Sequence, residues 1–241
     1  GEGMQGAIFG IVATLLLFVS VTLHELGHSL QALKYGVKVR DITLMPMGGL
    51  AQMESIPEEP NKELRIALAG PLVNFGIAAL LIGLGALLDA RALVSLEELQ
   101  ASLGIVSWSG LLAYLTSANL ILGLFNLIPA FPMDGGRVLR ALLAKKMDHA
   151  KATKIAAQVG QGLALLMGLW GFMSGSWTLV LIAIFVWMGA GQESQGTQVK
   201  HTLGGTTVGQ AMTRSPHALQ VNDSLSKAVE LTLSTSQADF P

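Results

Sequence analysis

Cysteine is absent from the sequence, and charged residues are scarce. None of the 241 residues is cysteine, and Asp, Glu, Lys and Arg together make up only 13%. Disulfides and thiolate metal sites are therefore excluded, so any metal must be bound by His and carboxylate side chains. The net charge of −1 comes without a block of basic residues. Nucleic acid is thus not expected as a partner, because phosphate binding requires clustered Lys and Arg.

Apolar residues dominate the chain instead. They account for 51% of the sequence, and the mean hydropathy is +0.55. Both values are typical of a polytopic membrane protein rather than a soluble domain. The sequence predicts an all-α membrane fold with about five transmembrane helices, at residues 6–33, 64–88, 105–127, 155–173 and 177–190.

One short segment between the first two spans has the pattern of β-structure. Residues 37–53 contain β-branched side chains and a Met47-Gly48-Gly49 turn that follows Pro46. We expect a small membrane-associated hairpin or sheet there, because the segment is too polar and too short to span. Two interpretations stay open. It is a plain interfacial hairpin, or its strand edges bind an extended peptide by strand addition.

The distribution of Lys and Arg predicts the orientation of the spans. The loop after the first span is basic, residues 89–102 have an excess of acidic residues, and residues 137–154 are basic again. By the positive-inside rule the two basic segments are cytoplasmic. The end of the first span and the end of the third would then lie on the same, cytoplasmic, side of the bilayer.

The first span carries the pentapeptide His24-Glu25-Leu26-Gly27-His28. Residues four apart share one face of a helix, so His24 and His28 can direct two imidazoles at one metal ion, with Glu25 beside them. A third protein ligand must come from elsewhere, and an open position is left for a water that Glu25 can deprotonate. The alternative is a structural pairing of the three side chains. It is disfavoured because an ionisable group in so apolar a run needs a strong partner.

A second polar motif follows the third span, more than 100 residues after the histidines. It reads Asn126-Leu-Ile-Pro129-Ala-Phe-Pro132-Met-Asp134-Gly135. A carboxylate on such a broken backbone at membrane depth must ligate something or pair with Arg137. Both explanations of Asp134 stay open on this ground alone. Asn126 can equally be an amide that packs two helices together.

Taken together, these motifs and Gly70-Pro71-Leu72-Val73-Asn74 resemble the site-2 protease family of intramembrane zinc metalloproteases, over about residues 6–190. The resemblance implies a core of six transmembrane helices in the family and a Zn²⁺ ion bound by His24, His28 and Asp134. It also implies that Glu25 is the general base. Asn126 and Asn74 match positions that the family associates with substrate binding or with support of the site.

The implied activity is hydrolysis of peptide bonds within or near transmembrane segments of membrane proteins. The implied substrate is a transmembrane protein, such as a membrane-tethered transcriptional regulator, which must unwind locally before it is cut. The lipid bilayer is the other expected partner. The active site would face the cytoplasmic side of an integral, multi-pass membrane protein.

The end of the chain differs in composition. Residues 191–205 are rich in Gly, Gln and Thr and are expected to form a linker after a core of residues 1–190. Residues 206–241 resemble the start of a soluble α/β CBS repeat, a module found in one branch of the family. About half of one repeat is present, so adenine nucleotide is expected only at a complete CBS pair. We also expect the chain to be a fragment, because the family usually has another span before the histidine motif.

A different class of function is consistent with the same residues. Intramembrane His and Asp side chains can form the permeation site of a CBS-regulated divalent-metal transporter or channel. Transporters often contain an internal repeat with matching broken helices, and neither motif occurs twice here. A catalytically inactive relative is disfavoured because Glu25 and the three metal-ligand candidates are all present. The remaining histidines, His149, His201 and His217, lie in polar segments and are expected to be solvated.

Overall fold

The computed structural model describes residues 2–45, 48–53, 57–87, 107–203, 217–220 and 222–235, and residues 207, 209 and 237. The chain forms two compact units, residues 1–197 and residues 198–241. The predicted acidic loop at residues 89–102 and the Pro46-Met47 part of the predicted turn lie outside the described residues.

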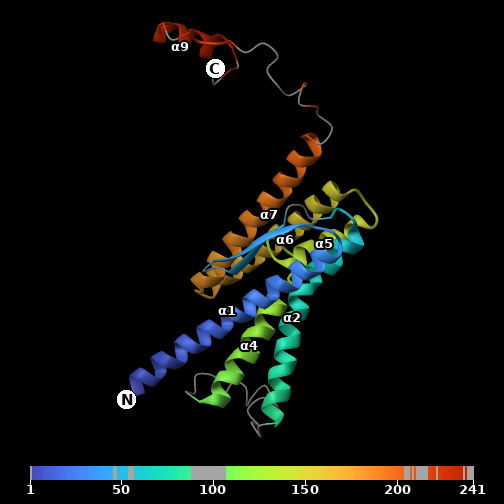
Figure 1. Ribbon diagram of the computed structural model, residues 1–241, viewed down its shortest axis with the longest axis vertical. Coiled ribbons are helices and arrows are strands. Elements are labelled where there is room, and N and C mark those ends of the chain that lie inside the picture. Colours follow the sequence, from blue (N-terminus) through green and yellow to red (C-terminus); the bar gives the residue numbers. More distant parts are fainter. Residues whose placement is uncertain are drawn as a thin grey trace. The chain divides into compact units, whose positions relative to one another are not determined.

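Helix α1, Glu2–Lys34, carries the first apolar run and the pentapeptide (Figure 1). It ends where Gly36 adopts a φ of +77°, a left-handed conformation that residues with a Cβ rarely take. The Gly36 N–H then donates to the Leu33 carbonyl at 3.0 Å, and the Val37 N–H donates to the Ala32 carbonyl at 3.2 Å. These bonds close the helix and turn the chain into the next segment.

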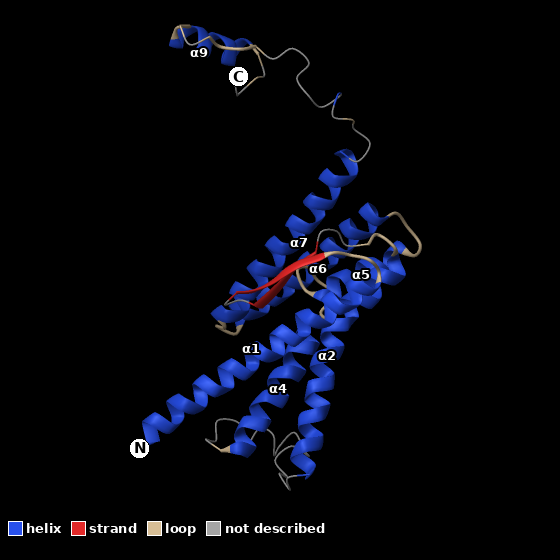
Figure 2. Cartoon of the chain, viewed as in Figure 1, coloured by secondary structure: helices blue, strands red, loops and turns tan. Residues whose placement is uncertain are grey.

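The segment predicted as a hairpin or sheet forms two antiparallel strands. Strand β1 is Val39–Met45 and strand β2 is Gly48–Met53, with Leu44 opposite Gly49 (Figure 2). Both strands contact α1. Among the residues that the structure describes, each strand pairs only with the other.

Helices α2, Pro60–Leu87, and α4, Trp108–Asn126, lie beside α1 and contact it and each other (Figure 1). Proline suits the first position of α2, where its missing N–H is not needed. Ser107 caps α4 by accepting a hydrogen bond from the Gly110 N–H at 3.0 Å. Gly27 of α1 lies so close to α2 that an added Cβ would be 2.9 Å from the Ala69 carbonyl oxygen. The lack of a side chain there lets the two backbones approach.

The irregular connection after α4 leads into α5, Asp134–Ala144. The connection is buried by α6, His149–Met173, and α7, Trp177–Leu203. Residues of the connection and of both helices form the core around it, namely Ala130, Met133, Ala164 and Val186 in one cluster and Phe131, Ala156, Ala157 and Ala190 in another. The packing of α6 and α7 against the connection thereby fixes the position of the start of α5.

Among the described residues, five helices are long and apolar enough to cross a membrane: Gly3–Lys34, Pro60–Leu87, Trp108–Asn126, His149–Met173 and Trp177–Val199. Large apolar side chains along them are exposed to the surroundings of the protein, for example Ile11 and Leu15, both at 61%. The number of spans agrees with the five predicted from the sequence.

Two predicted boundaries are wrong. Helix α6 begins at His149 rather than at residue 155, because the Asp148 carboxylate caps it by accepting from the Ala150 N–H at 3.0 Å. The basic stretch of residues 137–154 therefore includes the end of α5 and the start of α6. Helix α7 continues to Leu203, although residues 191–205 were expected to be a linker. Its extension is stabilised where Glu193 pairs with Arg140 of α5.

In the second unit, α9 comprises Leu225–Ser234. Ser224 caps it, with its hydroxyl accepting from the Lys227 N–H at 3.4 Å. Residues 210–216, which belong to the predicted CBS-like segment, lie outside the described residues.

Candidate metal centre

The helical spacing of the pentapeptide places both histidines on the buried face of α1. His24 is 4% exposed and His28 is 3% exposed, while Leu23, Leu26 and Leu30 point outward. The two imidazole rings lie edge to face, with centroids 4.7 Å apart and planes at 83°. Their Nε2 atoms are 3.1 Å apart. The two rings therefore face one point in the interior of the bundle.

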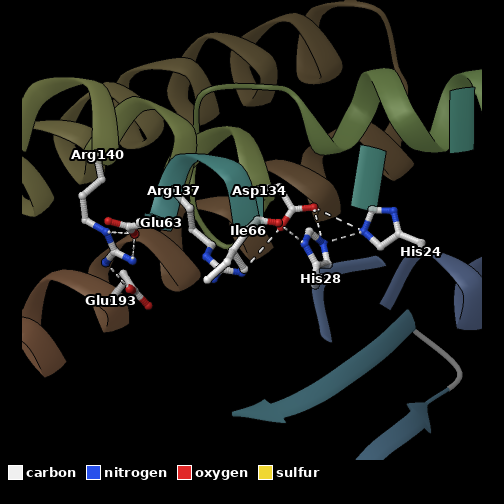
Figure 3. A network of polar contacts seen from close by, with 8 residues as sticks. All are labelled: His24, His28, Glu63, Ile66, Asp134, Arg137, Arg140 and Glu193. Atoms are coloured by element: carbon white, nitrogen blue, oxygen red, sulfur yellow. Dashed lines mark hydrogen bonds and ion pairs between the residues drawn. The ribbon is translucent and has the colours of Figure 1, made fainter. Parts of the chain in front are cut away.

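Asp134, the first residue of α5, supplies the third group (Figure 3). Its Oδ2 atom lies 3.2 Å from the His24 Nε2 and 3.1 Å from the His28 Nε2. The three atoms form a nearly equilateral triangle, and all three side chains are buried. Residues 106 or more positions apart in the sequence thus meet at one site, as the separate motifs predicted.

The outer nitrogen of each imidazole also has a partner. The His28 Nδ1 is 2.7 Å from the Ile66 carbonyl oxygen, and the His24 Nδ1 is 2.5 Å from the Asn74 Oδ1. Because a backbone carbonyl can only accept, the His28 Nδ1 must donate, and its Nε2 carries a lone pair. Metal-ligating histidines commonly donate their other N–H to such an acceptor.

This donor set fits a zinc ion. Tetrahedral zinc with ligands at about 2.0–2.1 Å separates its ligand atoms by roughly 3.3–3.4 Å. The three atoms here are 3.1–3.2 Å apart, close to that value. A carboxylate oxygen and imidazole lone pairs that converge in a buried space repel one another unless a cation lies between them. Three protein ligands leave a fourth position open, as catalytic zinc sites require.

Asp134 divides its two carboxylate oxygens between different partners. While Oδ2 faces the histidines, Oδ1 lies 3.7 Å from Nη1 of Arg137, one turn further along α5. The ion pair and the metal site, which are alternatives from the sequence, are therefore both present in the geometry. The positive charge of Arg137 favours the ionised form of Asp134, which is the form that binds a metal.

The sequence singles out three further site residues, Glu25, Asn74 and Asn126. Glu25 follows His24 directly on α1 and is half-buried. Asn74 is fully buried at 0% exposure, and its Oδ1 is bonded to His24. Asn126 lies at the end of α4, where its Nδ2 donates to the Leu122 carbonyl of its own helix at 3.0 Å. The predicted roles of Asn74 and Asn126 in substrate binding stay predictions.

Sequence reasoning missed a second buried polar group, drawn on the left of Figure 3. Glu63 of α2 is 0% exposed, and its Oε1 accepts from the Arg140 Nε at 2.7 Å. Arg140 also donates to Glu193 of α7. The His149 Nε2 lies 3.5 Å from the Glu63 Oε2, so the expectation that His149 is solvated is wrong. No motif marks this group, and all of its residues lie outside the spans predicted from the sequence, so no signal in the sequence pointed to it.

Comparison with known proteins identifies the family. The model of peptidase family M50 matches residues 12–167, a range that includes His24, His28 and Asp134. The chain belongs to peptidase family M50. Zinc metalloprotease MJ0392 of Methanocaldococcus jannaschii is 43% identical over 238 residues, which are 99% of this chain and 66% of that protein. Stage IV sporulation protein FB of Bacillus subtilis is 28% identical over 159 residues, 66% of this chain and 49% of that protein.

A solved structure agrees with this assignment. The site-2 protease from Methanocaldococcus jannaschii superposes with a TM-score of 0.56 at 45% identity, covering 79% of this chain and 88% of that chain. The M50 chain described here spans 66% of the length of zinc metalloprotease MJ0392 and 49% of that of stage IV sporulation protein FB. Its family and its five apolar helices make it an integral membrane protein.

Proposed function

We propose that this chain is the catalytic core of an intramembrane zinc metalloprotease, which hydrolyses peptide bonds within or near transmembrane segments of membrane proteins. The observation that carries the proposal is the triangle of His24, His28 and Asp134 atoms, buried between helices that are apolar enough to span a bilayer. The names of its relatives, zinc metalloprotease and site-2 protease, support the same activity.

The residues around the triangle have separate tasks. A zinc ion bound there would polarise the scissile carbonyl and make a nearby water more acidic. Glu25, adjacent to His24 on α1, takes the proton of the attacking water and passes it to the leaving amine. Arg137 holds the outer oxygen of Asp134, so that the inner oxygen stays directed at the two histidines.

The position of these residues in the membrane determines what they can cleave. By the positive-inside rule, the Lys and Arg residues of the first loop and of α5 support the proposal that the centre faces the cytoplasmic side. A transmembrane helix keeps its peptide bonds hydrogen-bonded, so a substrate must unwind before it reaches the site. The β1–β2 hairpin contacts α1, and no third strand pairs with it within the described part of the chain. Its edge therefore offers backbone groups to which an extended peptide can add as a further strand.

The substrate proposed for this site is a transmembrane protein, with a membrane-tethered transcriptional regulator as one example. Asn126 is proposed to bind the backbone of the unwound segment, because it stands at the end of α4, eight residues before Asp134. Residues 206–241 are proposed to begin a CBS repeat, which would bind adenine nucleotide only when a complete pair of repeats is present. The capped helix α9 lies in the described part of that segment.

The proposal is tested by cleavage in reconstituted vesicles with a purified Glu25→Gln variant. The substrate is a single-span polypeptide that carries a helix-breaking residue near its cytoplasmic end. We expect wild-type protein to cut it and Glu25→Gln to bind zinc normally but to lose cleavage by at least about a hundredfold, since general base catalysis contributes that much.

A matched control is Glu59→Gln, which removes an equally charged but exposed carboxylate that pairs with Lys62. This control should cleave as fast as the wild type. Retained cleavage in Glu25→Gln contradicts the proposal. Zinc uptake into vesicles by the wild type, without cleavage, would instead favour the divalent-metal transporter.

A further inference from the structure

A row of buried amide side chains connects His24 to the backbone of α4. Asn74 of α2 faces His24 through its Oδ1, and its Nδ2 donates to the Asn119 Oδ1 at 2.9 Å. The Asn119 Nδ2 in turn donates to the Leu115 carbonyl at 2.9 Å and to the Ser20 hydroxyl at 3.1 Å. Asn74 and Asn119 are both 0% exposed. Water therefore cannot replace any of these bonds.

The direction of every hydrogen bond in this row follows from the Leu115 carbonyl, at the end of the row opposite His24. The Leu115 carbonyl can only accept, so the Asn119 atom beside it must be the NH₂ group. The Asn119 oxygen then faces Asn74 and accepts from the Asn74 NH₂ group. The Asn74 oxygen is consequently the atom that faces His24. Its partner there, the Nδ1 of His24, must be the protonated nitrogen.

This direction decides which nitrogen of His24 is free to bind a metal. A neutral imidazole carries one N–H, so a protonated Nδ1 leaves the lone pair on Nε2. The Nε2 atom is the one that lies 3.2 Å from the Asp134 Oδ2 and 3.1 Å from the His28 Nε2. The row of amides thus specifies the tautomer that the metal centre needs.

The same tautomer of His28, with the proton on Nδ1, is fixed by the protein backbone directly. Its Nδ1 donates to the Ile66 backbone carbonyl at 2.7 Å, and that acceptor has a fixed polarity. His24 depends instead on a side-chain amide, whose oxygen and nitrogen ends have nearly the same shape. Rotated by half a turn, Asn74 would offer an NH₂ group to the Nδ1 of His24, and the proton would move to Nε2. Asn119 prevents this rotation, because its own oxygen can only accept and therefore requires the NH₂ group of Asn74 to face it.

We propose that Asn119 is a positioning residue of the metal centre, which fixes the orientation of the Asn74 amide and through it the Nδ1–H tautomer of His24. The proposal rests on the proposed metal site, but its first test does not require metal. Asn119 is not adjacent in sequence to any motif, and it touches neither the ligand atoms nor the site of the reaction. It acts on them through Asn74.

The direct test is the ¹⁵N spectrum of histidine-labelled, metal-free protein at a pH where His24 is neutral. We expect one His24 tautomer in the wild type, with the proton on Nδ1. In Asn119→Leu, which is similar in size but has no polar atom, we expect a second signal from the Nε2–H tautomer. A wild-type His24 protonated on Nε2, or a mixture in the wild type, would overturn the proposal even if no variant folds.

Zinc affinity provides the second measurement, by competition with a chromophoric chelator. Loss of an outer hydrogen-bond partner of a ligand typically lowers metal affinity by about 10–100-fold, and we expect Asn119→Leu to fall within this range. Thr116→Val is the matched control. Thr116 is also buried on α4, at 1% exposure, and within the described part of the chain its hydroxyl has no hydrogen-bond partner. Its replacement should leave the affinity unchanged.

A conservative variant separates positioning from simple anchoring of α4. In Asn119→Asp, position 119 keeps an oxygen toward Asn74 whether the new carboxyl is charged or protonated. The Asn74 amide should then keep its orientation, and zinc affinity should stay within about threefold of the wild type, well short of the loss expected for a missing outer partner. If Asn119→Asp loses as much affinity as Asn119→Leu, or if Asn119→Leu loses none, the positioning role is wrong. Absence of zinc binding in the wild type, with the expected tautomer present, would count against the proposed function and not against this row of amides.

Discussion

Gly70 of α2 lies directly against the imidazole of His28, with no room for a side chain between them. A Cβ added to Gly70 would lie 2.6 Å from the His28 Cε1 and 2.7 Å from the His24 Cε1, closer than real Cβ atoms approach. This contact explains why a glycine stands one position before Pro71 in α2. Both imidazoles need the space that this glycine leaves.

This contact predicts the effect of a single methyl group. In Gly70→Ala the new Cβ would displace one or both imidazoles, and a shift of a ligand atom by half an ångström exceeds the tolerance of a zinc site. We expect zinc affinity to fall at least about tenfold, as for other disturbances of ligand orientation. Equilibrium dialysis with a zinc buffer measures this directly.

Gly76→Ala is the control for that experiment. Gly76 lies on the same helix, and nothing lies within 4 Å of the position its Cβ would occupy. The substitution should leave zinc affinity unchanged. Equal affinity in the two variants would show that the space beside His28 is not needed.

The buried ion pair between Arg140 and Glu63 predicts a large effect on stability. Arg140 is 2% exposed, and removal of one partner leaves the other charge buried without compensation. We expect Arg140→Met to reduce the free energy of unfolding by about 3–5 kcal/mol. Unfolding followed by circular dichroism in detergent, over a range of denaturant concentrations, gives the difference from the wild type.

The exposed pair of Lys62 and Glu59 provides the comparison. These residues are also joined at 2.7 Å, but the Glu59 side chain is 67% exposed. Lys62→Met should therefore change the free energy of unfolding by less than about 1 kcal/mol. If the two variants lose the same stability, the Arg140 pair contributes no more than a surface pair.

Metal removal should destabilise the protein as well as inactivate it. Without a cation, the Asp134 oxygen and the lone pairs of the histidines face one another at 3.1–3.2 Å. Zinc that binds only the folded state at about a thousand times its dissociation constant adds roughly 4 kcal/mol of stability. We expect a chelator to lower the unfolding temperature and added zinc to restore it. An unfolding temperature that does not respond to either reagent would contradict this account of the centre.

The sequence was sufficient for the ligand set but not for its supports. His24 and His28 could be predicted because a helix has a fixed period. A carboxylate in an apolar region needs a partner, but that partner could equally be Arg137, so the ligand role of Asp134 followed only from the family resemblance. Asn119 could not be predicted, since a single amide in the middle of a span has no spacing that distinguishes support of a ligand from helix packing. The signal that was available is its depth in an apolar helix, which requires a hydrogen-bond partner.

The helix boundaries were missed for a related reason. The extension of α7 to Leu203 depends on Glu193, whose partner Arg140 is 53 positions earlier in the chain. Local composition of residues 191–205, rich in Gly and Thr, favours a linker, and only the tertiary contact reverses this preference. The start of α6 has a local cause instead. Its cap, Asp148, directly precedes the helix but stands within a run of basic residues, where its capping role is hard to recognise.

The central claim is that Asp134 completes a zinc site with His24 and His28. The most direct measurement is the zinc content of purified wild-type and Asp134→Ala protein, determined by mass spectrometry after dialysis against a weak chelator. The account predicts one zinc ion per chain in the wild type and a large loss in the variant, with helical content retained. The same zinc content in both proteins would contradict it and remove Asp134 from the metal centre.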